Sequence, residues 1–337
     1  MNNKINFKNL NDLQKIWISE LSYVDLTEEG YKKIIEGGLT VKELKQYVKN
    51  PDLPFCGDIL LGAKMFNTLS AVVLGNDHFP TKLDIVNALI ENGLSDLKIK
   101  HTSDYPTPFA SSFQALTLED DFQNTAISYR GSDLYISNII LREWLESNIL
   151  EYFSDTSTQV KEAIGYFKAH KNLNGNNYIY GHSLGGNLVS HVYLNHHDEI
   201  KEAFSINGTP INQKLIDTEK KKKAFNDKKF SFNIVCGDLV GQLKSCDVYK
   251  ANVNYIQNNN SMKESVLSAH LIQASAFDGN GNFLKITEQE MQTKINRFTF
   301  KFINLSKITR EKLNRIDFKL NKNNMYTIID ISKKKKV

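Results

Sequence analysis

The sequence has few cysteines, no long apolar run and little net charge, and each shortage excludes a class of protein. Its 337 residues include only three cysteines, Cys56, Cys236 and Cys246, an odd number that lacks the spacing of a metal site or a disulfide framework. A reducing compartment fits this set best. The net charge of +4 is small for the length and argues against nucleic acid as a partner.

Neither a signal peptide nor a membrane span is visible in the sequence. The N-terminal stretch MNNKINFKNLNDLQKIW lacks a continuous apolar segment, and the most apolar stretch, ILLGAKMFNTLSAVVLG, is interrupted by Lys64 and Asn67. We therefore expect a cytoplasmic protein without a transmembrane segment. Export by a dedicated machine, without a cleavable signal peptide, would leave no trace of this kind and stays an alternative.

The hydrophobic pattern changes twice along the chain. Up to about residue 100, apolar residues recur at helical spacing, as in LQKIWISELSYV and KLDIVNALIENGL. From Ser111 onward, SFQALTL and TAISYR alternate like the strands of a hairpin, and β-like runs follow at NNYIY, EAFSIN, FSFNIVC and NVNYIQ, with helical patterns between several of them. Beyond Phe283 the chain is rich in lysine and asparagine, with helical periodicity in EQEMQTKINRFTFKFI.

These patterns predict an α/β protein with a mostly parallel central sheet flanked by helices. We expect a helical N-terminal region at residues 1–104 that packs on the core. The α/β core would span residues 105–284. A lysine-rich C-terminal appendix would occupy residues 285–337.

One short stretch carries a chemical signature. Residues 178–192 read YIYGHSLGGNLVSHV, in which Gly181, Ser183 and Gly185 form the pattern G-x-S-x-G. A bare pattern of this kind arises by chance in about one chain in ten of this length. Here, however, a β-prone run precedes it and a helical run follows it, which is the strand–turn–helix setting of a nucleophile elbow. Ser183 is therefore the predicted nucleophile.

A serine hydroxyl needs a base to take its proton and a carboxylate to orient that base. In hydrolases with this elbow, the acid and then the histidine follow the serine along the chain. Of the eight histidines, seven precede the serine, lie inside the motif or belong to the helix after it. Only His270, in SVLSAHLIQ, remains, and it is the predicted base.

Five aspartates lie between the predicted nucleophile and the predicted base. Asp238 directly follows the apolar run FSFNIVCG, at the expected end of a buried strand, and is the preferred acid. Asp247 is the second choice, because another strand-like run begins shortly after it. Asp217 and Asp227 flank a lysine cluster and are expected to be solvated, and Asp198 is better explained as a helix-end residue.

Acyl transfer also needs hydrogen-bond donors for the developing oxyanion. One is expected to be the backbone N–H of Leu184, the residue after the nucleophile. The second is expected from Ser132 in TAISYRGSD, where Gly131 lets the chain turn, although RGSD is also good chemistry for a plain turn. We expect no metal and no cofactor.

Several of these segments resemble a known family. AISYRGSD, REWLESN, YGHSLGGN, CGDLVGQL and AHLI resemble the class 3, fungal-type lipases, and are more similar still to a bacterial family of lipase-like α/β hydrolases. LSYVDL and SINGTPI are further matches to that bacterial family, and the resemblance runs from about Leu21 to Gly281. It implies an α/β-hydrolase fold, with Ser183, Asp238 and His270 as the triad. One departure is NGTPI, which stands where the bacterial family has an NGPG-like turn.

The expected substrate is an acyl lipid. The segment LYISNIILREWLESNILEYF, residues 134–153, is dense in large apolar side chains, and in lipases of this type the corresponding segment forms a lid or the adjoining helix. A packed core helix would explain half of these residues equally well. The sequence thus predicts a serine carboxylester hydrolase of the lipase or phospholipase A type, acting through an acyl-enzyme on acyl lipids, which a membrane surface could present.

Three alternatives stay open at this point. The same triad would serve a small-ester esterase, a thioesterase or an acyltransferase. The protein could instead be an antibacterial lipase toxin that is secreted without a leader, with the C-terminal appendix serving delivery. In the third alternative, the hydrolase fold is catalytically silent and acts as a binding module.

Overall fold

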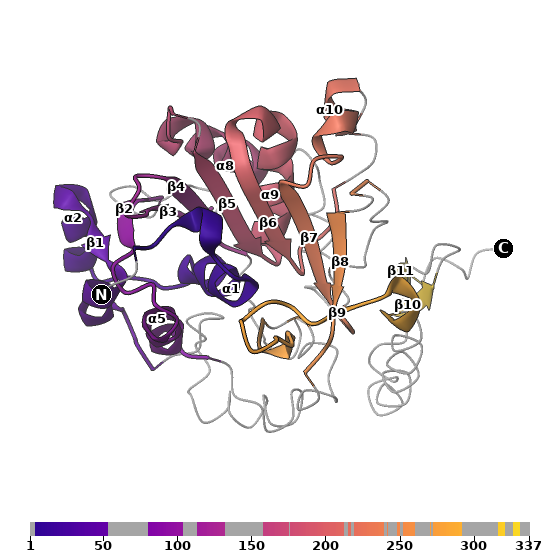
Figure 1. Ribbon diagram of the computed structural model, residues 1–337, viewed down its shortest axis with the longest axis horizontal. Helices are drawn as coiled ribbons and strands as arrows, with labels where there is room; N and C mark the ends of the chain where they lie inside the picture. The colour runs from indigo at the N-terminus through magenta and orange to yellow at the C-terminus, as the bar shows by residue number, and fades with distance from the viewer. Residues whose placement is uncertain are drawn as a thin grey trace.

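The computed structural model is an α/β structure built on one nine-stranded sheet (Figure 1). It describes residues 4–52, 80–103, 113–131, 158–174, 176–211, 215–216, 219–238, 241, 248–249, 252–259, 270, 272–291, 316–320 and 326–330. The strands of the sheet lie side by side in chain order, from β1 at one edge to β9 at the other.

The sheet is mixed, which corrects the expectation of a mostly parallel one. The strands are β1 (Leu39–Thr40), β2 (Lys98–Thr102), β3 (Ala115–Glu119), β4 (Thr125–Tyr129), β5 (Asn177–His182), β6 (Ile200–Ile206), β7 (Phe230–Val235), β8 (Val253–Ile256) and β9 (Lys285–Ile286). Strands β4 to β8 pair in parallel, whereas every pairing outside this central block is antiparallel. The predicted hairpin is confirmed as β3 and β4.

Helices cover both faces of the sheet. They are α1 (Asp12–Leu21), α2 (Glu28–Gly37), α3 (Val41–Leu44), α5 (Lys82–Glu91), α8 (Thr158–His170), α9 (Leu184–His196) and α10 (Glu219–Ala224), with short 3₁₀ turns at Phe7–Asn9, Lys45–Tyr47, His197–Glu199 and Ile272–Ala274. The helical patterns predicted before β2 and on either side of β5 are confirmed by α1, α5, α8 and α9. None of the helices within these described ranges is long and apolar enough to cross a bilayer.

The start of α1 is set by local chemistry. Asn11 precedes the helix and accepts a hydrogen bond from the backbone N–H of Gln14, while the Gln14 side chain accepts one from the backbone N–H of Asn11. This reciprocal capping box satisfies two donors that the first helical turn would otherwise leave free. Its effect is to start α1 at a defined residue, and so to fix which face of the helix meets the sheet.

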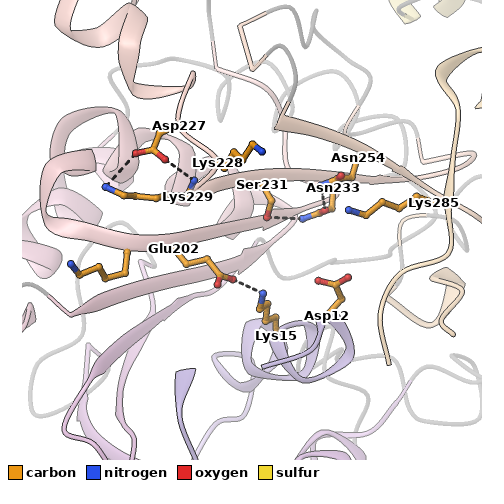
Figure 2. Close-up of a pocket in the computed structure, with 11 residues that line it drawn as sticks. Asp12, Lys15, Glu202, Asp227, Lys228, Lys229, Ser231, Asn233, Asn254 and Lys285 are labelled. Atoms are coloured by element: carbon orange, nitrogen blue, oxygen red, sulfur yellow. Dashed lines mark hydrogen bonds and ion pairs between the residues drawn. The ribbon is translucent and has the colours of Figure 1, made fainter. Parts of the chain in front are cut away.

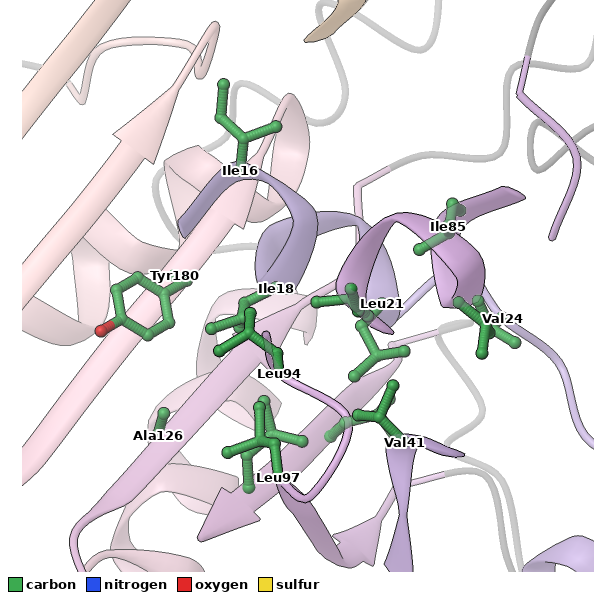
Figure 3. Close-up of a cluster of buried hydrophobic side chains, with 14 of the residues drawn as sticks. Ile16, Ile18, Leu21, Val24, Val41, Ile85, Leu94, Leu97, Ala126 and Tyr180 are labelled. Atoms are coloured by element: carbon green, nitrogen blue, oxygen red, sulfur yellow. The ribbon is translucent and has the colours of Figure 1, made fainter. Parts of the chain in front are cut away.

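Alternation along β5 divides the hydrophobic core into two clusters. Tyr178 and Tyr180 point into the cluster under α1 and α5, and Ile179 points into the one under α8 and α9. Figure 3 shows Ile18 and Leu21 of α1 in the first cluster, near the sheet. Because the N-terminal helices share this cluster with the sheet, they belong to the same folded body as the strands that carry the elbow.

The N-terminal region is not purely helical, as β1 and β2 both come from it and extend the sheet beyond β3. Strand β2 reads KIKHT, with one fully buried apolar side chain, Ile99. With a single buried apolar residue, this segment shows no alternation of apolar and polar side chains, and its place in the sheet depends on backbone pairing with β3. At the other end of the chain, β10 (Ile316–Leu320) and β11 (Tyr326–Asp330) form an antiparallel pair. Most of the helical pattern predicted at 288–303 lies outside the described residues, and the three-part division stays a prediction.

Candidate active site

Ser183 stands at a sharp turn between β5 and α9. Its backbone has φ 57° and ψ −126°, a positive-φ conformation that residues other than glycine rarely adopt. The backbone N–H of Ser183 still donates to the carbonyl oxygen of Ile206, at 3.0 Å, which ties the turn to β6. Strain of this kind costs roughly 1–3 kcal/mol and persists only where the surroundings enforce it. The predicted strand–turn–helix geometry is therefore present.

The two glycines of the motif allow the backbones around the turn to approach closely. A Cβ placed on Gly181 would lie 2.3 Å from the carbonyl oxygen of Gly185, and one on Gly185 would lie 2.1 Å from the carbonyl oxygen of Tyr129. Both neighbours are backbone atoms, which cannot rotate away. Glycine is required here for space, and the sequence pattern reflects that requirement.

We expect Gly185→Ala to lower the free energy of unfolding by about 3 kcal/mol, because the new methyl group has no room beside the backbone of β4. Urea unfolding followed by circular dichroism would measure the change. Gly165→Ala is the matched control, since Gly165 lies on the exposed side of α8 with nothing near its added Cβ. It should raise stability by roughly 0.5–1 kcal/mol. Equal stability of the two variants would contradict the account of Gly185.

The structure brings Ser183, His270 and Asp238 together. The Nε2 atom of His270 lies 2.8 Å from the Oγ atom of Ser183, and its Nδ1 atom lies 2.8 Å from Oδ1 of Asp238. The carboxylate can only accept, so Nδ1 carries the hydrogen and Nε2 is free to accept the serine proton. All three side chains are buried, and Oδ2 of Asp238 accepts a further hydrogen bond from the backbone N–H of Gly241 at 2.7 Å.

The alternative acids that the structure describes lie elsewhere. Asp198 is 3.1 Å from Nε2 of His197, and Asp227 is 3.3 Å from the ammonium group of Lys229. Both precede the strands that they introduce, at the end of the sheet away from Ser183. Asp217 and Asp247 lie outside the described residues. Of the candidate acids within the described residues, only Asp238 contacts the predicted base.

The second part of the predicted oxyanion site can be placed only in part. Leu184 is the first residue of α9, where the backbone N–H groups of a helix have no partner within the helix. Ser132 lies outside the described residues, as do residues 134–153 of the apolar segment. Its neighbour Gly131 is described, and a Cβ added there would lie 3.1 Å from Cβ of Ser183. The chain that leads to Ser132 therefore starts beside Ser183, the predicted nucleophile.

Two side chains that sequence reasoning did not select hold the backbone of His270. The carbonyl oxygen of His270 accepts a hydrogen bond from Nδ2 of Asn207 at 3.0 Å and lies 2.8 Å from Nε2 of His182. Asn207 belongs to the segment SINGTPI at the end of β6, so its position after a buried strand was an available signal. His182 is the x of the G-x-S motif and carried no such signal.

A polar depression of about 390 Å³ lies on the sheet face near α1 and β9 (Figure 2). Its walls include Lys15 of α1, Glu202 of β6, Asn233 of β7 and Lys285 of β9. Lys15 and Glu202 form an ion pair of 2.7 Å, and burial raises the pKa of Glu202 although Lys15 opposes the shift. No histidine is among its lining residues, and it lies toward the starts of the strands whose ends carry the Ser183 site. The described lining of the depression therefore holds no serine–histidine pair.

The model of the family described as Mbeg1-like matches residues 94–304, which is more than half of the chain. No sequence among the curated proteins matches. Among solved structures, the extracellular lipase LipA from Serratia marcescens is similar over 71% of this chain and 42% of its own, with 13% sequence identity and a TM-score of 0.32. The chain thus spans less than half the length of that lipase.

The segment that the family model matches contains the turn at Ser183 and the predicted acid and base, Asp238 and His270. It begins just before β2 and continues past β9, so it includes the central parallel block of the sheet. By the extent of this match, the chain belongs to the Mbeg1-like family, a lipase-like family.

Proposed function

We propose that this protein is a serine carboxylester hydrolase of acyl lipids, of the lipase or phospholipase A type, with an α/β-hydrolase core. The observation that carries the proposal is the chain of two 2.8 Å contacts from Ser183 through His270 to Asp238. Nucleophile, base and orienting carboxylate meet within hydrogen-bond reach although they come from distant parts of the sequence, and the serine stands at a strained turn.

In the proposed reaction, Oγ of Ser183 attacks the carbonyl carbon of the ester while its proton passes to Nε2 of His270. Asp238, hydrogen-bonded to Nδ1, stabilises the imidazolium that forms. The negative charge on the former carbonyl oxygen is stabilised by the backbone N–H of Leu184 and a donor at Ser132. When the tetrahedral intermediate collapses, His270 returns the proton to the departing alcohol and the acyl group stays on Ser183.

The second half of the reaction repeats these steps with water. A water molecule gives a proton to Nε2 of His270 and attacks the acyl carbon, and the collapse of the second tetrahedral intermediate releases the fatty acid. The proton then returns from His270 to Oγ of Ser183. The enzyme is regenerated, and neither a metal nor a cofactor takes part in this scheme.

A series of p-nitrophenyl esters with acetyl, butyryl, octanoyl and palmitoyl chains tests the lipid assignment. Each methylene that the site buries adds up to about 0.8 kcal/mol, or about fourfold in kcat/KM. We expect kcat/KM to rise with chain length, and phosphatidylcholine vesicles to release fatty acid. Ser183→Ala is the control for both assays. An optimum at the shortest esters would contradict the lipid assignment and favour a small-ester esterase.

A further inference from the structure

A fully buried carboxylate and imidazole lie directly behind the Ser183 site. Glu20, near the end of α1, has no exposed surface, and His182, the last residue of β5, is 2% exposed. Oε1 of Glu20 lies 2.8 Å from Nδ1 of His182. The other ring nitrogen of His182, Nε2, lies 2.8 Å from the backbone carbonyl oxygen of His270.

The chemistry of these two contacts fixes where the protons lie. A carbonyl oxygen only accepts, so Nε2 of His182 must carry a hydrogen. Burial alone would lower the pKa of His182, but the Glu20 carboxylate outweighs it and raises this pKa above its ordinary value. The Glu20 carboxylate thus forms an ion-pair contact of 2.8 Å with Nδ1 of His182, on the side of the ring opposite the contact with His270.

His270 is consequently held at two places. Asp238 and Ser183 contact its ring, and His182 and Asn207 contact its backbone carbonyl oxygen. The rings of His182 and His270 lie 5.0 Å apart at their centres, so the supporting ring packs beside the base itself. A small rotation of His182 would shift the backbone from which the His270 ring projects.

Helix docking by itself does not require such a pair. The neighbouring buried positions of α1, Ile16, Ile18 and Leu21, contact the sheet through apolar side chains. Replacing a buried ion pair by apolar residues is often neutral or stabilising, which makes the pair a weak device for stability. Because His182 of this pair contacts the backbone of His270, the pair is better explained by a role in positioning the predicted base.

We propose that Glu20 and His182 are positioning residues for His270. Helix α1 thereby contributes to the active site although it carries neither the nucleophile nor the acid nor the base. This inference rests on the proposed function, in which His270 is the general base. Glu20 orients His182, His182 fixes the backbone of His270, and the His270 ring is thereby presented to Ser183.

Kinetics of the full-length chain test the proposal. Glu20→Ala and His182→Ala are each expected to lower kcat for p-nitrophenyl butyrate by about 100-fold, as does a displacement of about 1 Å at a reacting group. KM should change little, because the interaction lost acts on the chemical step. The loss of kcat in Glu20→Gln should be much smaller, since the glutamine amide can donate to Nδ1 and keep the ring of His182 in place.

Ser128→Ala is the matched control. The Ser128 hydroxyl of β4 donates to the carbonyl oxygen of Ile18 at 2.7 Å, so this variant loosens α1 without touching His182. Its kcat should stay near that of the wild type. A loss as large as that of Glu20→Ala would overturn the proposal, because helix docking in general would then explain the effect. Wild-type kcat in Glu20→Ala would overturn it as well.

A spectroscopic readout separates this proposal from the proposed function. The Nδ1 proton of His270, hydrogen-bonded to Asp238, should give a far-downfield proton resonance that Asp238→Asn removes. We expect the resonance to persist in Glu20→Gln and Ser128→Ala and to vanish in Glu20→Ala and His182→Ala. If the wild type hydrolyses no ester, the proposed function fails, and the resonance alone decides. Its persistence in Glu20→Ala would then overturn the positioning role.

Discussion

Ser183→Ala is expected to abolish covalent labelling by a fluorophosphonate probe and to lower kcat for ester hydrolysis by about 10⁶-fold. The expectation follows from the contact of Oγ of Ser183 with Nε2 of His270, which makes this hydroxyl the one that can lose its proton to a base at the elbow. Labelling of the purified protein, read by mass spectrometry of the intact chain, measures the first effect, and initial rates on p-nitrophenyl butyrate measure the second.

The other two members of the triad should show a graded response. His270→Ala should match Ser183→Ala, because without the base the hydroxyl is not activated, and Asp238→Asn should cost about 10⁴-fold in kcat. Ser190→Ala is the matched control, since Ser190 lies in the same helix and its hydroxyl donates to the carbonyl oxygen of Gly186, away from His270. Labelling of Ser183→Ala at the wild-type rate would refute the assignment of the nucleophile.

Asp25→Ala is expected to lower the free energy of unfolding by about 3 to 5 kcal/mol, the cost of removing one partner from a buried ion pair. Oδ1 of Asp25 lies 2.9 Å from the Arg130 guanidinium, and Oδ2 lies 2.5 Å from the Lys82 ammonium group. The Lys82 and Arg130 side chains are only 1% and 5% exposed, so both cations depend on partners within the protein. This carboxylate joins the segment after α1 to α5 and to the end of β4.

Urea unfolding at neutral pH would measure this loss, with Glu28→Ala as control, because Glu28 pairs with Lys32 on the exposed surface of α2. Burial favours the neutral form of Asp25, but Arg130 and Lys82 outweigh it and hold the pKa of the carboxyl below 3.8. The contribution of Asp25 is thus complete above pH 3.8 and is lost as the pH falls through the folded-state pKa. An unchanged urea midpoint in Asp25→Ala would contradict the prediction.

The elements of the central block could be predicted because their signals are local. The strand pattern at β5 and the helical pattern at α9 each repeat at their own period, and the glycines between them report a steric requirement of the turn. Strand β2 carries no such pattern, because Ile99 is its one fully buried apolar side chain. It is held by backbone pairing with β1, which precedes it in the chain, and with β3, which follows it. Of the antiparallel pairings in the sheet, the sequence predicted the β3–β4 hairpin, whose strands follow each other directly, but not those of β1, β2 and β9.

The candidate site divides in the same way. Chain order and the ends of strands were sufficient to select His270 and Asp238, since parallel strands bring their carboxyl ends to one edge of the sheet. The sequence gives no separate signal for His182, which is a variable position of the G-x-S-x-G motif, or for Glu20, which lies far from that motif. Their relation depends on how α1 packs across β4 and β5, which involves side chains far apart in the sequence.

The sequence by itself determined the strand–turn–helix at Ser183 and the order of the residues that would activate it. Both depend on short stretches of sequence, namely the glycines that the tight turn requires and the residues that follow each strand. Only the tertiary structure decided that the sheet is mixed and that Glu20 reaches His182 behind the active site. It also placed Asp25 between two buried cations. Those features depend on which surfaces meet when the N-terminal helices pack, and packing between distant segments leaves no periodic pattern in the chain.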